Sequence, residues 1–301
     1  MESLKPLWEE LYRESADGTL FQSYDWNLIA AQTFAGREDP FVVAIENASG
    51  AAIIPACIAA NPIKFLGDEL FDYPGALCAG DSECAQVALA EVARLRLPIE
   101  VHGLRTIDGP WSDLPIEAFS GAPYVERDLP PNEFIRRHTR SARQMRRLER
   151  MGVRPRRYSG THRSLLNFIY AAKASHEKSL FRDSIRRAFI EQVALYDSVE
   201  CEIFTLETSS SLVAAIVTFR DGGVRRFYTT YFAEPWSKHS PGIALLFHAT
   251  ECSLREGLAC DYMTGEHGYK LRLATGIVPL YRLARIRLDH FYAERELALA
   301  A

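Results

Sequence analysis

Four ionisable side chains that could carry out chemistry lie within ten residues of one another. They are Asp261, Glu266, Tyr269 and Lys270. Two glycines between them allow the backbone to turn sharply, so that the side chains can converge. Such a group could supply a general base, Asp261 or Glu266, and a proton donor, Tyr269 or Lys270. A solvated surface turn has the same composition, and spacing alone does not separate the two interpretations.

The residues just before this group predict a helix over 240–257 with well-defined ends. Ser240 is a favourable N-cap, Pro241 suits the first helical position, and Gly257 is placed for a left-handed C-terminal cap. The apolar residues between them recur at helical spacing. We therefore expect an amphipathic helix that buries one face and holds the ionisable group in place.

A strand and a turn precede this helix. Residues 224–232 are rich in aromatic residues and threonine, which favours a β-strand, and the turn that follows contains Gly242. The first turn of the helix carries no acid, so its free amides and positive dipole end are available to an anion. Lys238 and His239 lie just upstream and could add charge. The segment predicts an anion site, although an ordinary strand-to-helix connection has the same pattern.

The segment from 240 to 270 resembles a known enzyme family. The matching residues are Ser240, Pro241, Gly242, Gly257, Asp261, Gly265, Glu266, Tyr269 and Lys270. They resemble the carboxy-terminal half of bacterial acetyltransferases linked to cellulose and exopolysaccharide biosynthesis. That family is a branch of the Gcn5-related N-acetyltransferase (GNAT) superfamily and is related to the Fem-type peptidyltransferases. Weaker similarity extends over most of the chain, including residues 21–26.

The resemblance implies an N-acetyltransferase that binds acetyl-CoA at the turn before the helix. The residues that it assigns to the donor are Tyr231, Phe232, Lys238, His239, Ser240, Gly242, Ile243 and Ala244. The superfamily's pyrophosphate loop has Gln or Arg, two residues, Gly, one residue, and then Gly or Ala. In this sequence the three defined positions of that loop are His239, Gly242 and Ala244. The first position departs from the pattern, because a histidine stands where the superfamily has Gln or Arg.

Direct acyl transfer to an amine needs three functions and no covalent nucleophile, and the sequence has no Gly-x-Ser-x-Gly elbow. Glu266 or Asp261 would take a proton from the amine. Backbone amides of the strand at 231–233 would stabilise the oxyanion. Tyr269 would protonate the departing thiolate. Lys270 would hold a ligand carboxylate or phosphate, or would pair with Glu266.

The composition is typical of a soluble globular protein, with 48% hydrophobic and 25% charged residues. No run approaches the ~20 apolar residues of a membrane span. The N-terminus carries acids where a signal peptide needs a basic start and an apolar run, so we expect a cytoplasmic protein. The six cysteines show neither a CxxC pair nor metal-ligand spacing with histidine, which predicts reduced core residues and no metal site.

The two halves of the chain have a similar order of expected elements. This order predicts an α+β fold of two tandem GNAT-like units, a degenerate one over 1–129 and an acyltransferase one over 130–301. A helix expected over 82–95 begins beside Asp81 and carries Glu83 in its first turn. These acids satisfy the helix dipole and would repel a pyrophosphate. Only the second unit is therefore expected to carry the acyl-CoA site.

Further elements follow from turn residues and alternation. Residues 41–58 predict a hairpin, in which Pro55 would make the second strand an edge or bulged strand. Residues 105–123 are rich in Gly, Pro and Trp and are expected to be irregular, with a strand following over 124–129. The alternation over 278–288 predicts the final strand.

The most basic stretch of the chain lies between the two halves. It contains ten arginines against one acid, Glu149: Arg136, Arg137, Arg140, Arg143, Arg146, Arg147, Arg150, Arg154, Arg156 and Arg157. Asn132 can cap a helix from Glu133 to Met151 that ends at Gly152. We expect an anionic ligand at 133–157, either RNA, CoA phosphates, an anionic sugar nucleotide or a membrane surface, because like charges repel one another. The alternative is a solvated face paired with acidic loops of the first half.

Two other functions remain open. A Fem-like aminoacyltransferase would take aminoacyl-tRNA as its donor, use the arginine-rich helix for RNA and leave the turn at 239–244 empty. A catalytically silent anion-binding module would use the GNAT-like units as a scaffold, although a net charge of −4 disfavours a general nucleic-acid binder. The residues do not select the acceptor among a sugar amine, an amino acid, a peptide or a polysaccharide precursor.

Overall fold

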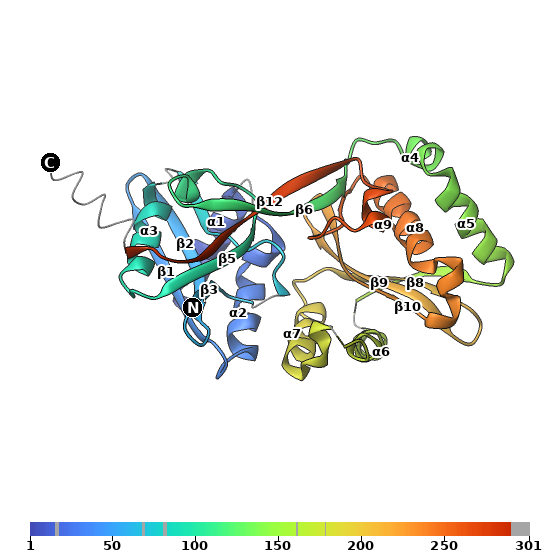
Figure 1. Ribbon diagram of the computed structural model, residues 1–301, viewed down its shortest axis with the longest axis horizontal. Coiled ribbons are helices and arrows are strands. Elements are labelled where there is room, and N and C mark those ends of the chain that lie inside the picture. Colours follow the sequence, from blue (N-terminus) through green and yellow to red (C-terminus); the bar gives the residue numbers. More distant parts are fainter. Residues whose placement is uncertain (16–17, 68–69, 81–82, 161, 178, 290–301) are drawn as a thin grey trace. The chain divides into compact units, whose positions relative to one another are not determined.

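The computed structural model describes residues 1–289 except 16–17, 68–69, 81–82, 161 and 178. The chain divides into two compact units (Figure 1). Unit 1 comprises residues 1–120 and the chain from 279 onward, and unit 2 comprises residues 121–278. The sequence predicts a single boundary at 129–130. The structure instead divides the chain after residue 120 and again after residue 278, each time inside a strand, and most of the last strand belongs to unit 1.

Unit 1 combines a mixed sheet with three helices. Its helices are α1 (Lys5–Glu14), α2 (Tyr24–Thr33) and α3 (Glu83–Ala93), and its short 3₁₀ helices are Glu2–Leu4, Leu20–Gln22 and Gly109–Trp111. Its strands are β1 (Asp39–Asn47), β2 (Gly50–Ile58), β3 (Ile63–Phe65), β4 (Leu77–Gly80), β5 (Pro98–Leu104) and most of β12 (Gly276–Arg287). The strand order is β1-β2-β3-β5-β12, and β4 pairs with β2.

Strand β2 shows how unit 1 builds its core. Ile54 and Ala56 belong to the cluster that α3 covers, whereas Ala51 and Ile53 pack with residues of α1 and α2. Alternate residues of a strand point to opposite faces. Helices therefore cover both faces of this sheet, and the strand is buried on both sides.

Unit 2 also combines a mixed sheet with helices. Its helices are α4 (Pro131–Arg137), α5 (Thr139–Arg150), α6 (Arg163–Ala174), α7 (Ser184–Ala194), α8 (Pro241–Arg255) and α9 (Gly268–Leu271), with 3₁₀ helices at Leu180–Arg182 and Glu234–His239. Its strands are the end of β6 (Ile116–Val125), β7 (Arg154–Ser159), β8 (Cys201–Glu207), β9 (Leu212–Asp221), β10 (Val224–Phe232) and β11 (Ala259–Asp261). The order is β6-β11-β10-β9-β8-β7.

Helices lie on both faces of the unit 2 sheet (Figure 1). Helices α4, α5 and α8 share one core cluster with β8, β9 and β10, in which Phe134 stacks on Phe247 with ring centroids 5.4 Å apart. Helices α6 and α7 cover the other face, where Phe168 of α6 contacts Tyr231 of β10 at 5.7 Å. None of the described helices is long and apolar enough to cross a membrane.

Most of the expected elements around the site are present. Strand β10 and helix α8 occupy the predicted segments, and Gly257 has the left-handed φ of +70° that ends the helix. Residues 41–58 form the expected hairpin, and the final strand is present as β12. The architecture is thus the mixed α/β fold that the sequence predicts.

Three expectations about local structure are wrong. The single helix over 133–151 is broken at His138, and α4 begins at Pro131 instead of being capped by Asn132. The break lets Phe134 pack on both His138 and Phe247. Strand β6 begins at 116, inside the segment expected to be irregular. Pro55 lies in an interior strand, since β2 has β1 on one side and β3 on the other.

Candidate active site

The site is built where two neighbouring strands of unit 2 separate. Strands β10 and β11 are parallel and pair over only three positions, the last of which joins Arg226 to Asp261. Strand β10 then continues to Phe232 without β11 as a partner, and its register with β9 shifts between Phe227 and Thr229. A bulge bends a strand and strengthens its twist. A gap therefore opens beside β10, and backbone groups of this strand face it.

The direction of each side chain of β10 follows from its contacts. The ring of Tyr231 lies against Phe168 of α6, so alternation turns Thr230 and Phe232 toward the face that α8 covers. The amide of Ala233 donates to Val213 at 2.9 Å, so it is not available as an oxyanion donor. Ladder alternation then directs the amide of Phe232 away from β9. The sequence predicts that the backbone amides of residues 231–233 stabilise the oxyanion. Of these three amides, only that of Phe232 points away from β9.

The turn before α8 exposes backbone amides. Residues Glu234–His239 form a 3₁₀ helix, and Ser240 adopts a left-handed conformation with φ 45° and ψ 52°. The side chain of Ser240 does not cap the helix as expected. A capping residue normally has extended backbone dihedrals, whereas those of Ser240 are left-handed. Pro241 has no N–H, and no backbone partner within the described residues is recorded for the amides of Gly242 and Ile243.

A cavity of about 290 Å³ lies at this turn. It is lined by Thr230, Phe232, Ser237, Ser240, Pro241, Gly242, Ile243 and Tyr269. The folded chain thus brings the end of β10, the first turn of α8 and the predicted proton donor into one cavity. The apolar side chains line its wall, and the first turn of α8 supplies the amides. An elongated ligand with an anionic part and an apolar part fits this combination.

Tyr269 is the predicted catalytic side chain that lines the cavity. It lies in the short helix α9 and is half-buried. Burial raises the pKa of Tyr269, and a side-chain hydrogen bond with Thr230 partly offsets this effect. The phenol therefore keeps its proton at neutral pH, as a proton donor to a thiolate must.

Asp261 is held in a buried ion pair. Its carboxylate accepts from Arg226 at 2.6 Å and from the amide of Met263 at 2.7 Å. Arg226 also donates to Asp221 at 2.6 Å, so one guanidinium joins β9, β10 and β11. These contacts favour a structural role for Asp261, which pins the strands at the position where they begin to separate.

Lys270 also has structural contacts. Its side chain is buried, and its ammonium donates to the carbonyls of Met263 at 3.1 Å and Thr264 at 2.7 Å. No ion pair with Glu266 is recorded among the described residues. The lysine satisfies the carbonyls of the turn after β11, where Met263 has a left-handed φ of 64°.

Glu266 is the exposed carboxylate of the predicted group. Its Oε1 lies close to Gly121 of β6, where an added Cβ would come within 2.8 Å of it. A base must reach the incoming amine, and Glu266 keeps the solvent access that Asp261 lacks. Of the two carboxylates, the geometry therefore favours Glu266 as the general base.

The remaining predicted donor residues are divided between the cavity and its surroundings. Lys238 is exposed, His239 contacts Trp236 with ring centroids 5.8 Å apart, and the carbonyl of His239 accepts from Gln144 of α5. Ala244 is fully buried, so its side chain belongs to the core. Tyr231 faces α6 and is not among the residues that line the cavity.

Burial disfavours the thiolate form of the three cysteines Cys201, Cys252 and Cys260. Burial raises the pKa of Cys201 to about 12 and that of Cys260 to about 12. Burial also raises the pKa of Cys252, the cysteine nearest a histidine. All six cysteines are free thiols, as the sequence predicts. Transfer without a covalent intermediate is consistent with this arrangement.

Sequence reasoning missed Thr230 and Lys173. Thr230 lines the cavity, and its carbonyl accepts from the ammonium of Lys173 at 3.0 Å. Lys173 follows Leu166, Ile169 and Tyr170, the buried residues of α6, at helical spacing. A lysine that continues an apolar stripe is the signal that could have identified it.

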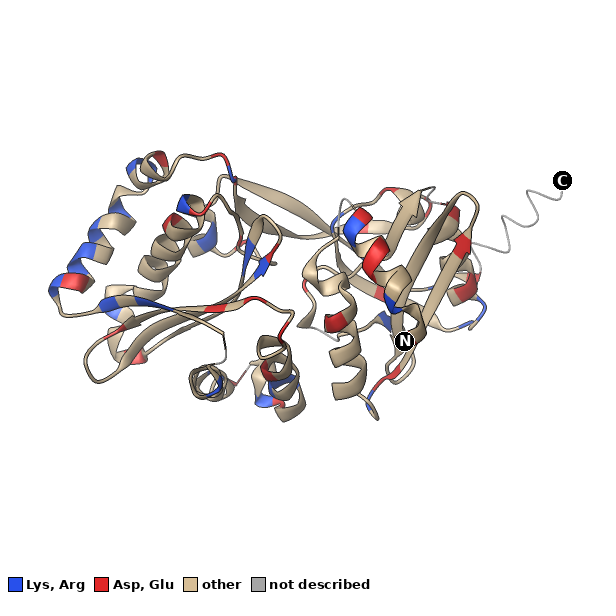
Figure 2. Cartoon of the chain, turned by 180° about the vertical axis from the view of Figure 1, so that it is seen from behind, with Lys and Arg blue, Asp and Glu red and all other residues tan. Residues whose placement is uncertain are grey.

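The basic stretch forms a largely unpaired surface on unit 2 (Figure 2). Three of its arginines pair with carboxylates: Arg137 with Glu133, Arg156 with Glu207, and Arg157 with Glu202 and Glu256. These carboxylates all belong to unit 2, not to the first half as the alternative supposed. The other seven have no carboxylate partner among the described residues: Arg136, Arg140, Arg143, Arg146, Arg147, Arg150 and Arg154.

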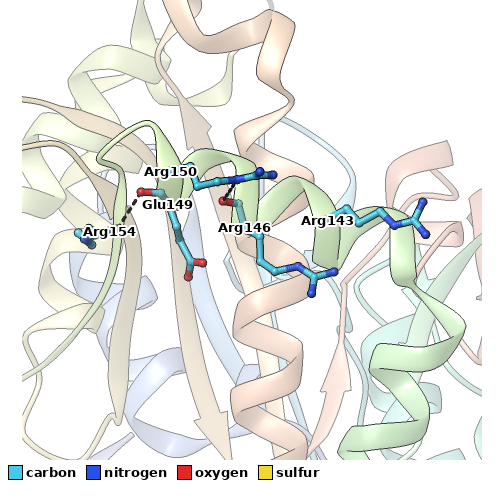
Figure 3. Close-up of a pocket in the computed structure, with 5 residues that line it drawn as sticks. All are labelled: Arg143, Arg146, Glu149, Arg150 and Arg154. Carbon is cyan, nitrogen blue, oxygen red and sulfur yellow. Dashed lines mark hydrogen bonds between the residues drawn. The ribbon is translucent and has the colours of Figure 1, made fainter.

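Four of these seven arginines surround an open hollow of about 760 Å³ (Figure 3). They are Arg143, Arg146, Arg150 and Arg154, and Glu149 also lines the hollow. Arg154 donates to the carbonyl of Glu149 at 2.8 Å. We define Arg143, Arg146, Arg150 and Arg154 as the arginine hollow. Its charge suits an anion better than a neutral ligand.

Comparisons with known proteins bear on the family and the fold of the chain. Residues 136–271 match the family described as "Acetyltransferase (GNAT) domain". No curated protein sequence matches the chain. The structure is similar to the C-terminal domain (DUF2156) of a putative lysylphosphatidylglycerol synthetase from Agrobacterium fabrum, with a TM-score of 0.60 and 10% identity, covering 97% of this chain and 96% of that one.

Two further solved structures show the same fold. FemX has a TM-score of 0.60 and 9% identity over 96% of this chain and 97% of its own. A tandem GNAT protein from the clavulanic acid biosynthesis pathway has a TM-score of 0.57 and 9% identity, over 94% and 95%. At these identities the likeness concerns the fold alone. Residues 136–271 are thus similar to a GNAT acetyltransferase domain, in a chain whose fold is GNAT-like.

Proposed function

We propose that the protein is an acyl-CoA-dependent N-acyltransferase that transfers an acetyl group from acetyl-CoA to an amine. One observation carries the proposal. The cavity of about 290 Å³ joins the first turn of α8, the separated end of β10 and Tyr269. These are the parts that an anionic thioester donor and its departing thiolate require.

The residues of the cavity fit the donor. The amides of Gly242 and Ile243, at the positive end of the α8 dipole, would hold the pyrophosphate. Phe232 and Ile243 offer apolar contact to the pantetheine arm. His239 Nδ1 is buried without a hydrogen-bond partner among the described residues, and a ligand at the turn would supply one. Bound acetyl-CoA supplies an activated thioester.

The chain's own groups then move two protons. The amine nitrogen bonds to the acyl carbon, and the carbon–sulfur bond breaks. Glu266 takes the proton that the amine loses, and Tyr269 gives a proton to the sulfur that leaves. The amide of Phe232 faces the gap and would stabilise the negative charge on the acyl oxygen.

The acceptor is an amine on a sugar, an amino acid or a polysaccharide precursor. The association with cellulose or exopolysaccharide biosynthesis is carried by the resemblance of residues 240–270 and not by any contact in the cavity. The arginine hollow supports a second anionic ligand, because it combines four guanidinium groups with a single carboxylate.

One observation favours a second candidate function. Seven arginines without a carboxylate partner among the described residues suit an RNA backbone, as an aminoacyl-tRNA donor would require. This candidate leaves the cavity at α8 without acetyl-CoA. The two functions therefore differ in one measurable property, the affinity of the turn at Gly242 for the CoA donor.

Isothermal titration with acetyl-CoA tests the proposal. The wild type should bind saturably, and Gly242→Glu should weaken binding at least about 100-fold, because like charges in contact cost several kcal/mol. Gly242→Ala should bind within a few-fold of the wild type, since its Cβ would lie 3.8 Å from Phe232.

A second control places the same charge at another helix. Ser184→Glu adds a carboxylate to the exposed first turn of α7 in the same unit, away from the cavity, and should bind normally. Absence of binding to the wild type would reject acetyl-CoA as the donor. Equal binding by wild type and Gly242→Glu would reject the turn as its site.

A further inference from the structure

Lys173 carries a half-buried ammonium group that the proposed chemistry does not use. Its Nζ donates to the carbonyl of Thr230 at 3.0 Å and lies 5.9 Å from the ring centroid of Phe181. No carboxylate within 4.0 Å of this nitrogen is recorded in the described part of the chain. Two more deeply buried cations of unit 2, Arg225 and Arg226, each pair with two carboxylates. The buried Lys270 instead donates to two backbone carbonyls.

Lys173 reaches the gap beside β10 from the face opposite the donor cavity. It belongs to α6, which covers one face of the sheet, whereas α8 covers the other (Figure 1). The side chain of Thr230 points to the α8 face and lines the cavity, while its carbonyl receives the lysine. An acceptor that enters from the α6 side would therefore meet Lys173 next to the acyl group of the donor.

The surroundings of Lys173 favour an anionic ligand. Burial lowers the pKa of Lys173, because the charged form is removed from water. One carbonyl and one aromatic ring replace only part of that hydration, and buried charges in proteins are normally paired. The ammonium has three hydrogens and uses one on Thr230. A ligand carboxylate would use another and supply the opposite charge.

We propose that the acceptor is a carboxylate-bearing amine, such as an amino acid, and that Lys173 binds its carboxylate. This inference rests on the proposed N-acyltransferase function and narrows its acceptor class. An amino sugar or a polyamine without an acid would offer the half-buried ammonium no opposite charge. Lys173 is thus a specificity residue on the acceptor side, separate from the donor turn at Gly242.

Matched acceptor pairs test this assignment. Glycine, L-leucine and L-phenylalanine are compared with their carboxamides, and with glucosamine, by the release of CoA thiol at saturating acetyl-CoA. At least one amino acid should exceed its amide about 10- to 100-fold in kcat/KM, the range expected for a hydrogen bond to a charged group. Equal rates within every pair, faster glucosamine, or no acetylated amino acid would overturn the assignment.

Substitutions separate specificity from folding. Lys173→Met should raise the KM of the preferred amino acid at least about tenfold and leave its carboxamide unchanged, while Lys173→Arg should retain part of the preference. Lys64→Met applies the same change to a half-buried lysine of unit 1 and should alter neither value. An equal loss for acid and amide in Lys173→Met would instead show a structural role.

Titration with acetyl-CoA keeps the two proposals distinct. The donor should bind wild type and Lys173→Met with the same Kd, since Lys173 is not among the residues that line the cavity. Loss of donor binding in the variant would reject a purely acceptor-side role. Absence of donor binding in the wild type would reject the acetyltransferase proposal itself, before any acceptor is examined.

Discussion

In both units a helix follows a strand, but the first turn of that helix carries an acid in unit 1 and none in unit 2. In unit 1, α3 follows β4 and carries Glu83 in its first turn. In unit 2, α8 follows β10 and its 3₁₀ turn, and its first turn has no acid. A carboxylate at a helix start occupies the positive dipole end. The two helix starts therefore differ by one acidic side chain. In α3 the carboxylate of Glu83 lies at the positive dipole end, and in α8 no acid does.

The strands beside the two junctions differ as well. In unit 1, β5 has β3 on one side and β12 on the other. In unit 2, β10 keeps β11 for only three positions and then faces a gap. Unpaired backbone groups of a strand can bind a ligand. In unit 2 a separated strand end lies beside a helix start without an acid, whereas β4, the strand before α3, pairs with β2 and precedes a helix start that carries Glu83. Asp81, the other acid expected at the unit 1 junction, lies outside the described residues.

The ion pairs that hold the strands of unit 2 together should dominate stability. Arg226→Met would leave the carboxylates of Asp221 and Asp261 without their shared partner, at a cost of about 3–5 kcal/mol of unfolding free energy. Urea denaturation measures this loss. Glu117→Gln removes an exposed pair of unit 1 and should cost at most about 1 kcal/mol. Similar losses for both variants would contradict the structural role of Arg226.

Removal of the proton donor should have the next largest effect. Tyr269→Phe should lower kcat about 100-fold, as expected for loss of a general acid, and leave the Kd of acetyl-CoA within a few-fold. Because burial raises the pKa of Tyr269, the wild-type phenol stays protonated beyond the ordinary tyrosine value of about 10. The alkaline decline of kcat that Tyr269 controls should lie above that pH. An unchanged kcat would remove Tyr269 from the mechanism.

An acid placed at the start of α8, as α3 has, should weaken acetyl-CoA binding by a smaller factor than Tyr269→Phe lowers kcat. Ser240→Asp should raise the Kd of acetyl-CoA about tenfold, equal to about 1.4 kcal/mol. Aspartate and asparagine both tolerate the left-handed conformation of Ser240, so Ser240→Asn is the matched neutral control. Tighter or equal binding in the aspartate variant would break the electrostatic comparison between the two junctions.

The reverse change in unit 1 should have no effect on donor binding. Glu83→Gln removes the acid from the first turn of α3 but does not supply a cavity like the one that Phe232, Ile243 and Tyr269 line beside α8. Titration with acetyl-CoA should give the wild-type stoichiometry of one site. A second binding site in this variant would show that the acid alone distinguishes the units and that the strand gap is unnecessary.

Much of this arrangement could be predicted from the sequence. Strand β10, helix α8 with Gly257 and the hairpin over residues 41–58 follow from local preferences, which depend on neighbouring residues. The break at His138 could not be predicted in this way. It depends on Phe134 packing against Phe247, which lies more than a hundred residues away in the chain.

The candidate site was predicted as a set of residues but not as an arrangement. Tyr269 and Gly242 were both identified, and the fold places them on one cavity. Asp261 and Lys270 were expected to act on a ligand, yet both have structural partners. Lys173 was overlooked because nothing near it in the sequence indicates that Thr230 would receive its ammonium.

The sequence by itself determined the local elements, the absence of acid at the start of α8 and the concentration of arginine over 136–157. The tertiary structure alone decided which ionisable groups are neutralised by partners and which remain available. Arg226 and Asp261 meet across 35 positions of the chain, and Lys173 and Thr230 across 57. A charge's role depends on its partners and its solvent access, and both are set by packing between distant segments.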